Sequence, residues 1–258
     1  MKEFVRQLIG PIVAKRGWTS VCEIGVSRGL STDRLLRLPN VSVTVVDPGF
    51  DLDLAAKYAG NPRVKLCKGN SLDVLPALDS AFDCILIDGD HNWYTVYNEL
   101  RVIFERQLLR PGGMIFFHDV EWPYGRRDMY CQPGTIPGQY RHPYARGGTV
   151  RGRSELSADS GLDDGLWKAT HEGGPRNGVL TAVEDFWREH RRQYQFALLR
   201  REAGLGAIHY RRDLVDDFRF AAFQCRASAY NLLTSPKRFA RTHFPTAYMY
   251  ARSTLGRT

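Results

Sequence analysis

The chain of 258 residues has a net charge of +8, and 43% of its residues are hydrophobic. This composition is typical of a packed globular protein and excludes an extended disordered chain. No apolar run approaches the ~18 residues of a membrane-spanning helix, and residues 1–12 carry Lys2, Glu3 and Arg6 where a secretory signal would be apolar. We therefore expect a cytoplasmic protein with no membrane span, whose five cysteines remain reduced thiols.

Hydrophobic periodicity predicts helices and strands that alternate along most of the chain. The helices are expected at residues 4–12, 31–38, 52–58, 72–78, 93–108 and 179–190. The strands are expected at residues 19–24, 41–46, 64–67, 82–87, 114–117, 194–199 and 206–210. Pro111-Gly112-Gly113 is expected to end the fifth helix before the fifth strand begins.

The first five strands alternate with helices and are almost continuously apolar, which favours a parallel, doubly wound α/β sheet. The last two form a hairpin around Glu202-Ala203-Gly204. The sequence thus predicts a mostly parallel, seven-stranded, Rossmann-like sheet with an antiparallel last strand, which occupies residues 1–210.

Two segments interrupt this pattern. Residues 122–178 form a long insertion after strand five, rich in Gly, Pro, Arg, Tyr and His. Because a loop of this length inside a compact domain is usually functional, we expect a substrate lid; a folded decoration or an oligomer contact is the alternative. Residues 211–258 form a basic, aromatic C-terminal extension that holds six of the eight net positive charges.

We expect this extension to pack on its own domain or to form a homo-oligomer, to which the insertion could also contribute. Contact with a membrane surface or RNA is the alternative. The rest of the chain is almost neutral, which argues against nucleic acid as a partner.

The loop after the first strand, Glu23-Ile24-Gly25-Val26-Ser27-Arg28-Gly29, fits two functions. Gly25-x-Ser27-x-Gly29 has the spacing of a hydrolase nucleophile elbow, but such an elbow lies in the middle of a sheet and not after its first strand. A cofactor loop is favoured, because Asp47 follows Gly25 by 22 residues, the spacing at which an acid binds a ribose diol. Glu23 would repel a pyrophosphate but would suit S-adenosylmethionine, which has a sulfonium, an ammonium and no phosphate.

Three further motifs complete a resemblance to the class I S-adenosylmethionine-dependent methyltransferases. They are Ile87-Asp88-Gly89-Asp90-His91, Leu109-Arg110-Pro111-Gly112-Gly113 and His118-Asp119. The chain is most similar to small-molecule enzymes, such as antibiotic-tailoring sugar O-methyltransferases and catechol-type enzymes. The resemblance implies that Glu23, Gly25, Ser27 and Gly29 surround the methionine part of the cofactor. It also implies that Asp47 binds the ribose, that Asn70 and Ser71 lie near the adenine, and that Asp88 faces the amino acid end or the substrate.

The acids and imidazoles after strands four and five are candidate catalytic and metal-binding groups. Asp88, Asp90 and Asp119 could hold Mg²⁺ or another divalent cation. Catechol-type relatives have an acid pair after strand five, and His118 departs from that pattern. The ordinary pKa of an imidazole suits a general base, so we predict His118, or else His91, as the base, with Asp119 orienting substrate or metal.

The sequence therefore predicts an O-methyltransferase that acts on a hydroxyl of a small polar natural product or sugar. Methyl transfer to nitrogen and methyl transfer to RNA remain open alternatives. A third is a non-haem-iron hydroxylase-like relative, in which His91, His118 and one aspartate form a two-histidine, one-carboxylate iron site. An inactive relative that only binds is the alternative outside enzymes.

Overall fold

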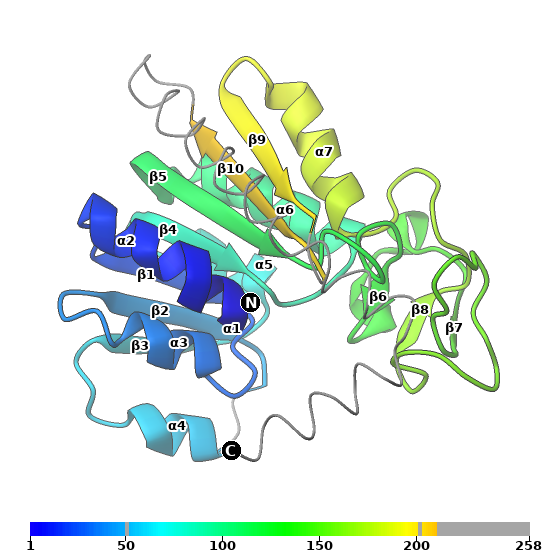
Figure 1. Cartoon of the computed structure of the whole chain (residues 1–258), viewed down its shortest axis with the longest axis horizontal. Helices are drawn as coiled ribbons and strands as arrows, with labels where there is room; N and C mark the ends of the chain where they lie inside the picture. Colours follow the sequence, from blue (N-terminus) through cyan, green and yellow to red (C-terminus); the bar gives the residue numbers. More distant parts are fainter. Residues whose placement is uncertain (50–51, 201–202, 211–258) are drawn as a thin grey trace.

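The computed structural model describes residues 1–49, 52–200 and 203–210, so the predicted C-terminal extension lies outside the described residues. Seven strands form one sheet in the order β3-β2-β1-β4-β5-β10-β9 (Figure 1). They are β1 (Ser20–Ile24), β2 (Ser42–Asp47), β3 (Val64–Lys68), β4 (Phe82–Ile87), β5 (Leu109–His118), β9 (Tyr194–Leu199) and β10 (Leu205–Tyr210). The first five are mutually parallel, and β10 is antiparallel to both β5 and β9. The predicted doubly wound sheet with an antiparallel last strand is thus confirmed.

Helices cover both faces of this sheet (Figure 1). One face carries α1 (Lys2–Phe4), a π-helical stretch (Val5–Ile9), α2 (Gly10–Arg16), α3 (Leu30–Leu35) and α4 (Leu52–Tyr58). The other face carries α5 (Ser71–Val74), a 3-10 turn (Leu75–Ala77), α6 (Trp93–Glu105) and α7 (Val179–His190). None of the helices in the described ranges combines the length and apolar character that a membrane span requires.

Alternation along the strands divides the apolar core into two layers. Val21 of β1 packs with the helices of the first face, whereas Cys22 and Ile24 pack with those of the second. Since successive side chains of a strand point to opposite faces, a strand covered on both faces must be apolar at almost every position. This is the physical reason for the continuous apolar runs in the sequence.

Strand β5 is longer than the sequence predicts. It begins at Leu109 rather than Met114, so Pro111-Gly112-Gly113 lies inside the strand and does not separate helix from strand. Gly112 has a φ of 76°, and a Cβ on Gly113 would lie 2.6 Å from the carbonyl oxygen of Asp83. The glycines therefore permit a local bulge, which matches the register shift between β4 and β5.

The insertion lies beyond the carboxyl ends of the strands, beside α6 and α7 (Figure 1). It contains a small antiparallel sheet of β6 (Met129–Tyr130), β8 (Trp167–Ala169) and β7 (Tyr144–Arg146). Two fully buried cations, Arg127 and Lys168, donate hydrogen bonds to backbone carbonyl oxygens of the surrounding loops. Strands of two or three residues are too short to show periodicity, which is why the sequence did not predict this sheet.

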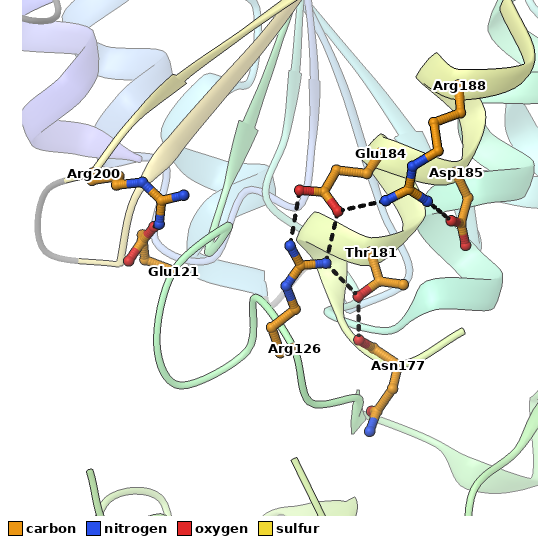
Figure 2. A network of polar contacts seen from close by, with 8 residues as sticks. All are labelled: Glu121, Arg126, Asn177, Thr181, Glu184, Asp185, Arg188 and Arg200. Atoms are coloured by element: carbon orange, nitrogen blue, oxygen red, sulfur yellow. Dashed lines mark hydrogen bonds and ion pairs between the residues drawn. The ribbon is translucent and has the colours of Figure 1, made fainter. Parts of the chain in front are cut away.

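Polar contacts fix both ends of the insertion to α7. The guanidinium of Arg126 donates two 2.8 Å hydrogen bonds to Glu184 of α7, and a third of 3.1 Å to Thr181 (Figure 2). Thr181 in turn donates to the carbonyl of Asn177, at the other end of the insertion. The backbone amide of Gly178, the last residue of the insertion, donates a 2.7 Å hydrogen bond to the buried carboxylate of Asp128, near the start of the insertion. The two ends are therefore held together and against the main domain.

Candidate active site

A cavity of about 310 Å³ lies where the glycine loop after β1 faces the ends of β4 and β5. Its walls come from the N-terminal residues, this loop, the start of α3 and the two strand ends. They are Met1, Lys2, Glu3, Phe4, Glu23, Gly25, Val26, Ser27, Arg28, Leu30, Ser31, Asp88 and His118. Ligands of open α/β sheets bind at this position, outside the carboxyl ends of the strands.

The glycine loop is held in a conformation that few sequences permit. Gly25 has a φ of 83°, and a Cβ at this position would lie 2.3 Å from the carbonyl oxygen of Asp88. Ser27 is also left-handed, with a φ of 48°. The Asp47 carboxylate accepts a 2.9 Å hydrogen bond from the backbone amide of Val26. The close approach of two strand ends at Gly25 is thus possible only without a side chain.

Glu23 is a buried acid in the wall of this cavity. It is 1% exposed and accepts a short hydrogen bond from the hydroxyl of Thr32. Burial raises the pKa of Glu23 to about 8, and the hydrogen bond from Thr32 offsets only part of that effect. The carboxyl group is therefore poised to ionise when a positive charge enters the cavity.

Two imidazoles and two carboxylates meet at the ends of β4 and β5. Nδ1 of His118 lies 2.8 Å from Oδ2 of Asp119 and 3.0 Å from Oδ1 of Asp88. Nε2 of His91 lies 2.8 Å from the same oxygen of Asp119 and 3.7 Å from Oδ1 of Asp88. Asp119 has a φ of 57°, a strained conformation for a residue with a side chain. Strain of this kind is common at functional sites.

The opposite charges in this group shift its pKa values in opposite directions. Burial alone would lower the pKa of His118, but the charge of Asp88 and the hydrogen bond with Asp119 raise it to about 9. In the same way the charge of Asp119 outweighs burial and raises the pKa of His91 to about 10. Burial would raise the pKa of Asp88 and of Asp119, yet the neighbouring imidazoles hold both pKa values below the ordinary range. Each carboxylate thus has an imidazole as its partner.

Two aromatic residues that the sequence did not single out contact these imidazoles. The ring of Phe4, in α1, lies edge-on to His118 with ring centroids 5.7 Å apart. Tyr124, early in the insertion, stacks on His91 at 5.5 Å, and its hydroxyl donates a 2.5 Å hydrogen bond to Asp163. No sequence feature predicts that Phe4 contacts His118, because Phe4 belongs to an ordinary amphipathic helical pattern. For Tyr124 the only indication was its position just after His118-Asp119.

Other predicted site residues lie elsewhere. Asp90 accepts hydrogen bonds from Asn92, Thr95 and the backbone of Cys131, and it is not part of the group around His118. This carboxylate joins the start of α6 to the insertion. Four more predicted residues do not line the cavity: Gly29, Asp47, Asn70 and Ser71.

Residues 22–120 of the chain match a family model described as a methyltransferase domain. This range runs from β1 to just past His118-Asp119, and so contains the glycine loop and both strand ends of the site. This part of the chain therefore resembles a methyltransferase domain. The match agrees with the methyltransferase resemblance that the sequence motifs indicate.

Solved structures similar to this chain share 15–16% identity with it. The SAH-bound methyltransferase PaMTH1 of Podospora anserina is 16% identical, with 78% of this chain and 75% of that chain covered, at a TM-score of 0.48. The SAM complex of the O-methyltransferase TomG of Streptomyces achromogenes, involved in Tomaymycin synthesis, is 15% identical, with 79% of this chain and 78% of that chain covered, at a TM-score of 0.46. An SAH complex of an O-methyltransferase of Bacillus cereus is 16% identical, with 81% of this chain and 80% of that chain covered, at a TM-score of 0.46. These scores are too low to support a statement about the acceptor, and no curated protein sequence matches the chain.

Proposed function

We propose that the protein transfers the methyl group of S-adenosylmethionine to a hydroxyl of a small polar acceptor, with His118 as general base. The observation that carries this proposal is the position of His118. It lines the same cavity as Glu23 and Asp88, and its Nδ1 lies within hydrogen-bond distance of two carboxylates. An imidazole that carboxylates hold through one nitrogen keeps the other, Nε2, for a proton of the substrate.

The charges around the cavity support the choice of cofactor. The carboxylate of Asp88, whose pKa is held low, would repel a pyrophosphate, whereas it attracts a sulfonium and an ammonium. A bound cation would also favour the ionised form of Glu23. In our proposal Gly25 and Ser27 surround the methionine part, whereas Gly29, at the N-terminus of α3, does not line the cavity. Asp47 keeps unused lone pairs for the ribose hydroxyls, and Asn70 and Ser71, at the start of α5, lie towards the adenine.

Methyl transfer is an in-line displacement at the sulfonium methyl carbon. The oxygen of the acceptor forms a bond to this carbon as the carbon–sulfur bond breaks, and the electron pair of that bond goes to sulfur. The hydroxyl proton passes to Nε2 of His118, while Asp88 and Asp119 stabilise the imidazolium that results. A bound sulfonium nearby lowers the pKa of His118 from its raised value, which increases the neutral fraction. Alignment of the two reacting atoms supplies several kcal/mol of the remaining barrier.

The insertion supports a polar, polyhydroxylated acceptor such as a sugar or a natural product. The insertion begins directly after His118-Asp119, and Tyr124, near its start, stacks on His91. Further along, the guanidinium of Arg176 lies 5.3 Å from the ring centroid of Tyr140 and 5.4 Å from that of Trp93. Aromatic faces beside guanidinium groups are well suited to sugar rings. Because both ends of the insertion are fixed, we propose a wall of the acceptor site rather than a swinging lid.

Calorimetry with S-adenosylmethionine and with NAD tests the cofactor first. We expect binding of S-adenosylmethionine alone, and binding of NAD alone would overturn the proposal. A panel of sugars, phenols, alcohols and amines then tests the acceptor by transfer of a labelled methyl group, with and without EDTA. We expect His118→Gln to abolish transfer to a hydroxyl while cofactor affinity is retained. His190→Gln, at the end of α7 and outside both the insertion and the cavity, is the matched control and should leave transfer unchanged.

A further inference from the structure

The last residue of the glycine loop, Gly29, determines where α3 begins. It is the N-cap of α3 with a φ of 71°, and as a glycine it has no side chain with which to cap the helix. Its carbonyl oxygen accepts the first hydrogen bond of α3, a 2.9 Å bond from the amide of Asp33. The two residues that follow Gly29 line the cavity, and Thr32 donates to the buried Glu23. The conformation of Gly29 therefore sets the position of one wall of the cavity.

Tyr58, the last residue of α4, holds this turn without lining the cavity. Its side chain is buried, and its hydroxyl lies 2.9 Å from both the carbonyl oxygen of Gly29 and Oδ1 of Asp33. Burial and the carboxylate of Asp33 raise the pKa of Tyr58, so the hydroxyl keeps its hydrogen for these two acceptors. A Cβ on Gly29 would lie 2.3 Å from this hydroxyl, so the contact requires glycine at position 29.

Lys57, the neighbouring residue of α4, contacts the same turn through a more exposed side chain. Its Nζ lies 2.6 Å from Oδ2 of Asp33 and 3.3 Å from the carbonyl oxygen of Arg28. The two side chains of this ion pair are 37% and 36% exposed, so water and salt weaken their attraction. The hydrogen bond from Tyr58 to Gly29 is buried, in contrast, and loses little to competition with water. Of the two contacts from α4, that of Tyr58 is therefore the one that fixes the turn.

We infer that Tyr58 is a positioning residue for the cofactor, whose hydroxyl holds Gly29 and the start of α3 in the conformation that binds S-adenosylmethionine. The inference rests on the proposed function. Asp47 holds the first half of the loop through the amide of Val26, and Tyr58 holds the second half. Glycine has more backbone freedom than any other residue, so the turn at Gly29 samples other conformations once this contact is lost. The affinity for a ligand falls in proportion to the fraction of molecules that keep the binding conformation.

The test is Tyr58→Phe in the full chain, which retains the ring and removes the hydroxyl. Tyr97→Phe is the matched control, because its hydroxyl donates a 2.6 Å hydrogen bond to Glu189 and lies outside the cavity. We expect calorimetry of the folded proteins to find S-adenosylmethionine bound about tenfold more weakly by Tyr58→Phe, and within about twofold of the wild type by Tyr97→Phe. In methyl-transfer assays Tyr58→Phe should raise KM for the cofactor by a similar factor and leave kcat within about twofold, since Tyr58 touches no reacting atom. A merely structural role would lower the free energy of unfolding without this change in affinity and KM.

Gly29→Ala tests the same contact from its other side, because the added Cβ displaces the hydroxyl of Tyr58. We expect this variant to bind S-adenosylmethionine at least about tenfold more weakly, and Tyr58→Phe introduced into it to change the affinity by less than about twofold, since the contact is already lost. An unchanged affinity in Tyr58→Phe, or a loss in the double variant equal to the product of the two single losses, would overturn the inference. In either case the wild type still binds S-adenosylmethionine if the proposed function holds. A wild type that does not bind S-adenosylmethionine overturns the proposed function itself.

Discussion

Gly25 should tolerate a methyl group far less well than another left-handed glycine of the same chain. The matched position is Gly17, the C-cap of α2. The two φ values are 83° and 64°, so Gly→Ala imposes a similar backbone strain of about 1–2 kcal/mol at each. A Cβ at Gly17 would meet nothing within 4 Å, whereas at Gly25 it would lie 2.3–2.5 Å from backbone atoms of Asp88 and Gly89.

The overlap at Gly25 involves backbone of two adjacent parallel strands, which cannot turn aside as a flexible side chain can. Overpacking of this kind adds about 1–3 kcal/mol. We therefore expect Gly25→Ala to lower the free energy of unfolding by about 2–5 kcal/mol, against about 1–2 kcal/mol for Gly17→Ala. Because the loop must move away from Asp88, Gly25→Ala should also weaken binding of S-adenosylmethionine, and Gly17→Ala should not.

Urea unfolding followed by circular dichroism measures both free energies, provided that the m values agree between the variants. Calorimetry of the folded variants measures the cofactor affinity. Losses of stability that agree within about 0.5 kcal/mol, with an unchanged affinity in Gly25→Ala, would refute the argument from close approach.

Three further outcomes are expected. The pKa of Glu23 is raised to about 8, and a bound cation favours its charged form, so the affinity for S-adenosylmethionine should rise with pH through that value as Glu23 releases a proton on binding. Calorimetry in two buffers with different heats of ionisation measures this release, which we expect in the wild type and not in Glu23→Gln. Subtracting the result for Glu23→Gln from that for the wild type removes the contribution of the cofactor's own titration. Arg126→Ala breaks the bidentate pair with Glu184 and should cost about 1 kcal/mol in urea unfolding, whereas Arg188→Ala, in the more exposed pair on the same acid, should cost less than about 0.5 kcal/mol (Figure 2). Equal losses would contradict this assignment. Ser27→Gly should raise the melting temperature by relief of up to about 1 kcal/mol of left-handed strain, and a lower melting temperature would contradict it.

Much of the fold could be predicted because its determinants are local. Strands buried on both faces must be apolar throughout, and the turns between them need Gly, Pro or Asn, so order and type of the elements are written into short windows of sequence. The segment Arg110-Pro111-Gly112-Gly113 was placed wrongly for the same reason. These residues end helices when judged alone, and the neighbouring strand at Asp83 is what turns them into a bulge of β5.

The candidate site was predicted only in part. His118, Asp119, Asp88 and His91 lie at the ends of neighbouring strands, and a parallel sheet brings such positions together whatever the details of packing. Asp90 lies only two residues after Asp88, yet its carboxylate accepts hydrogen bonds from α6 and from the insertion. That choice depends on side-chain direction and hydrogen-bond partners, which sequence spacing does not encode.

By itself, the sequence determined the α/β class and the sheet with its antiparallel end, and it predicted a cofactor loop after the first strand. The tertiary structure alone decided that His118 contacts two carboxylates through one ring nitrogen. It also decided that Phe4 and Tyr124 contact the two imidazoles, and that both ends of the insertion are fixed. The reason is physical. Periodicity and turn chemistry act over a few residues, whereas some of these contacts join positions more than a hundred residues apart, and their distances exist only once the core has packed.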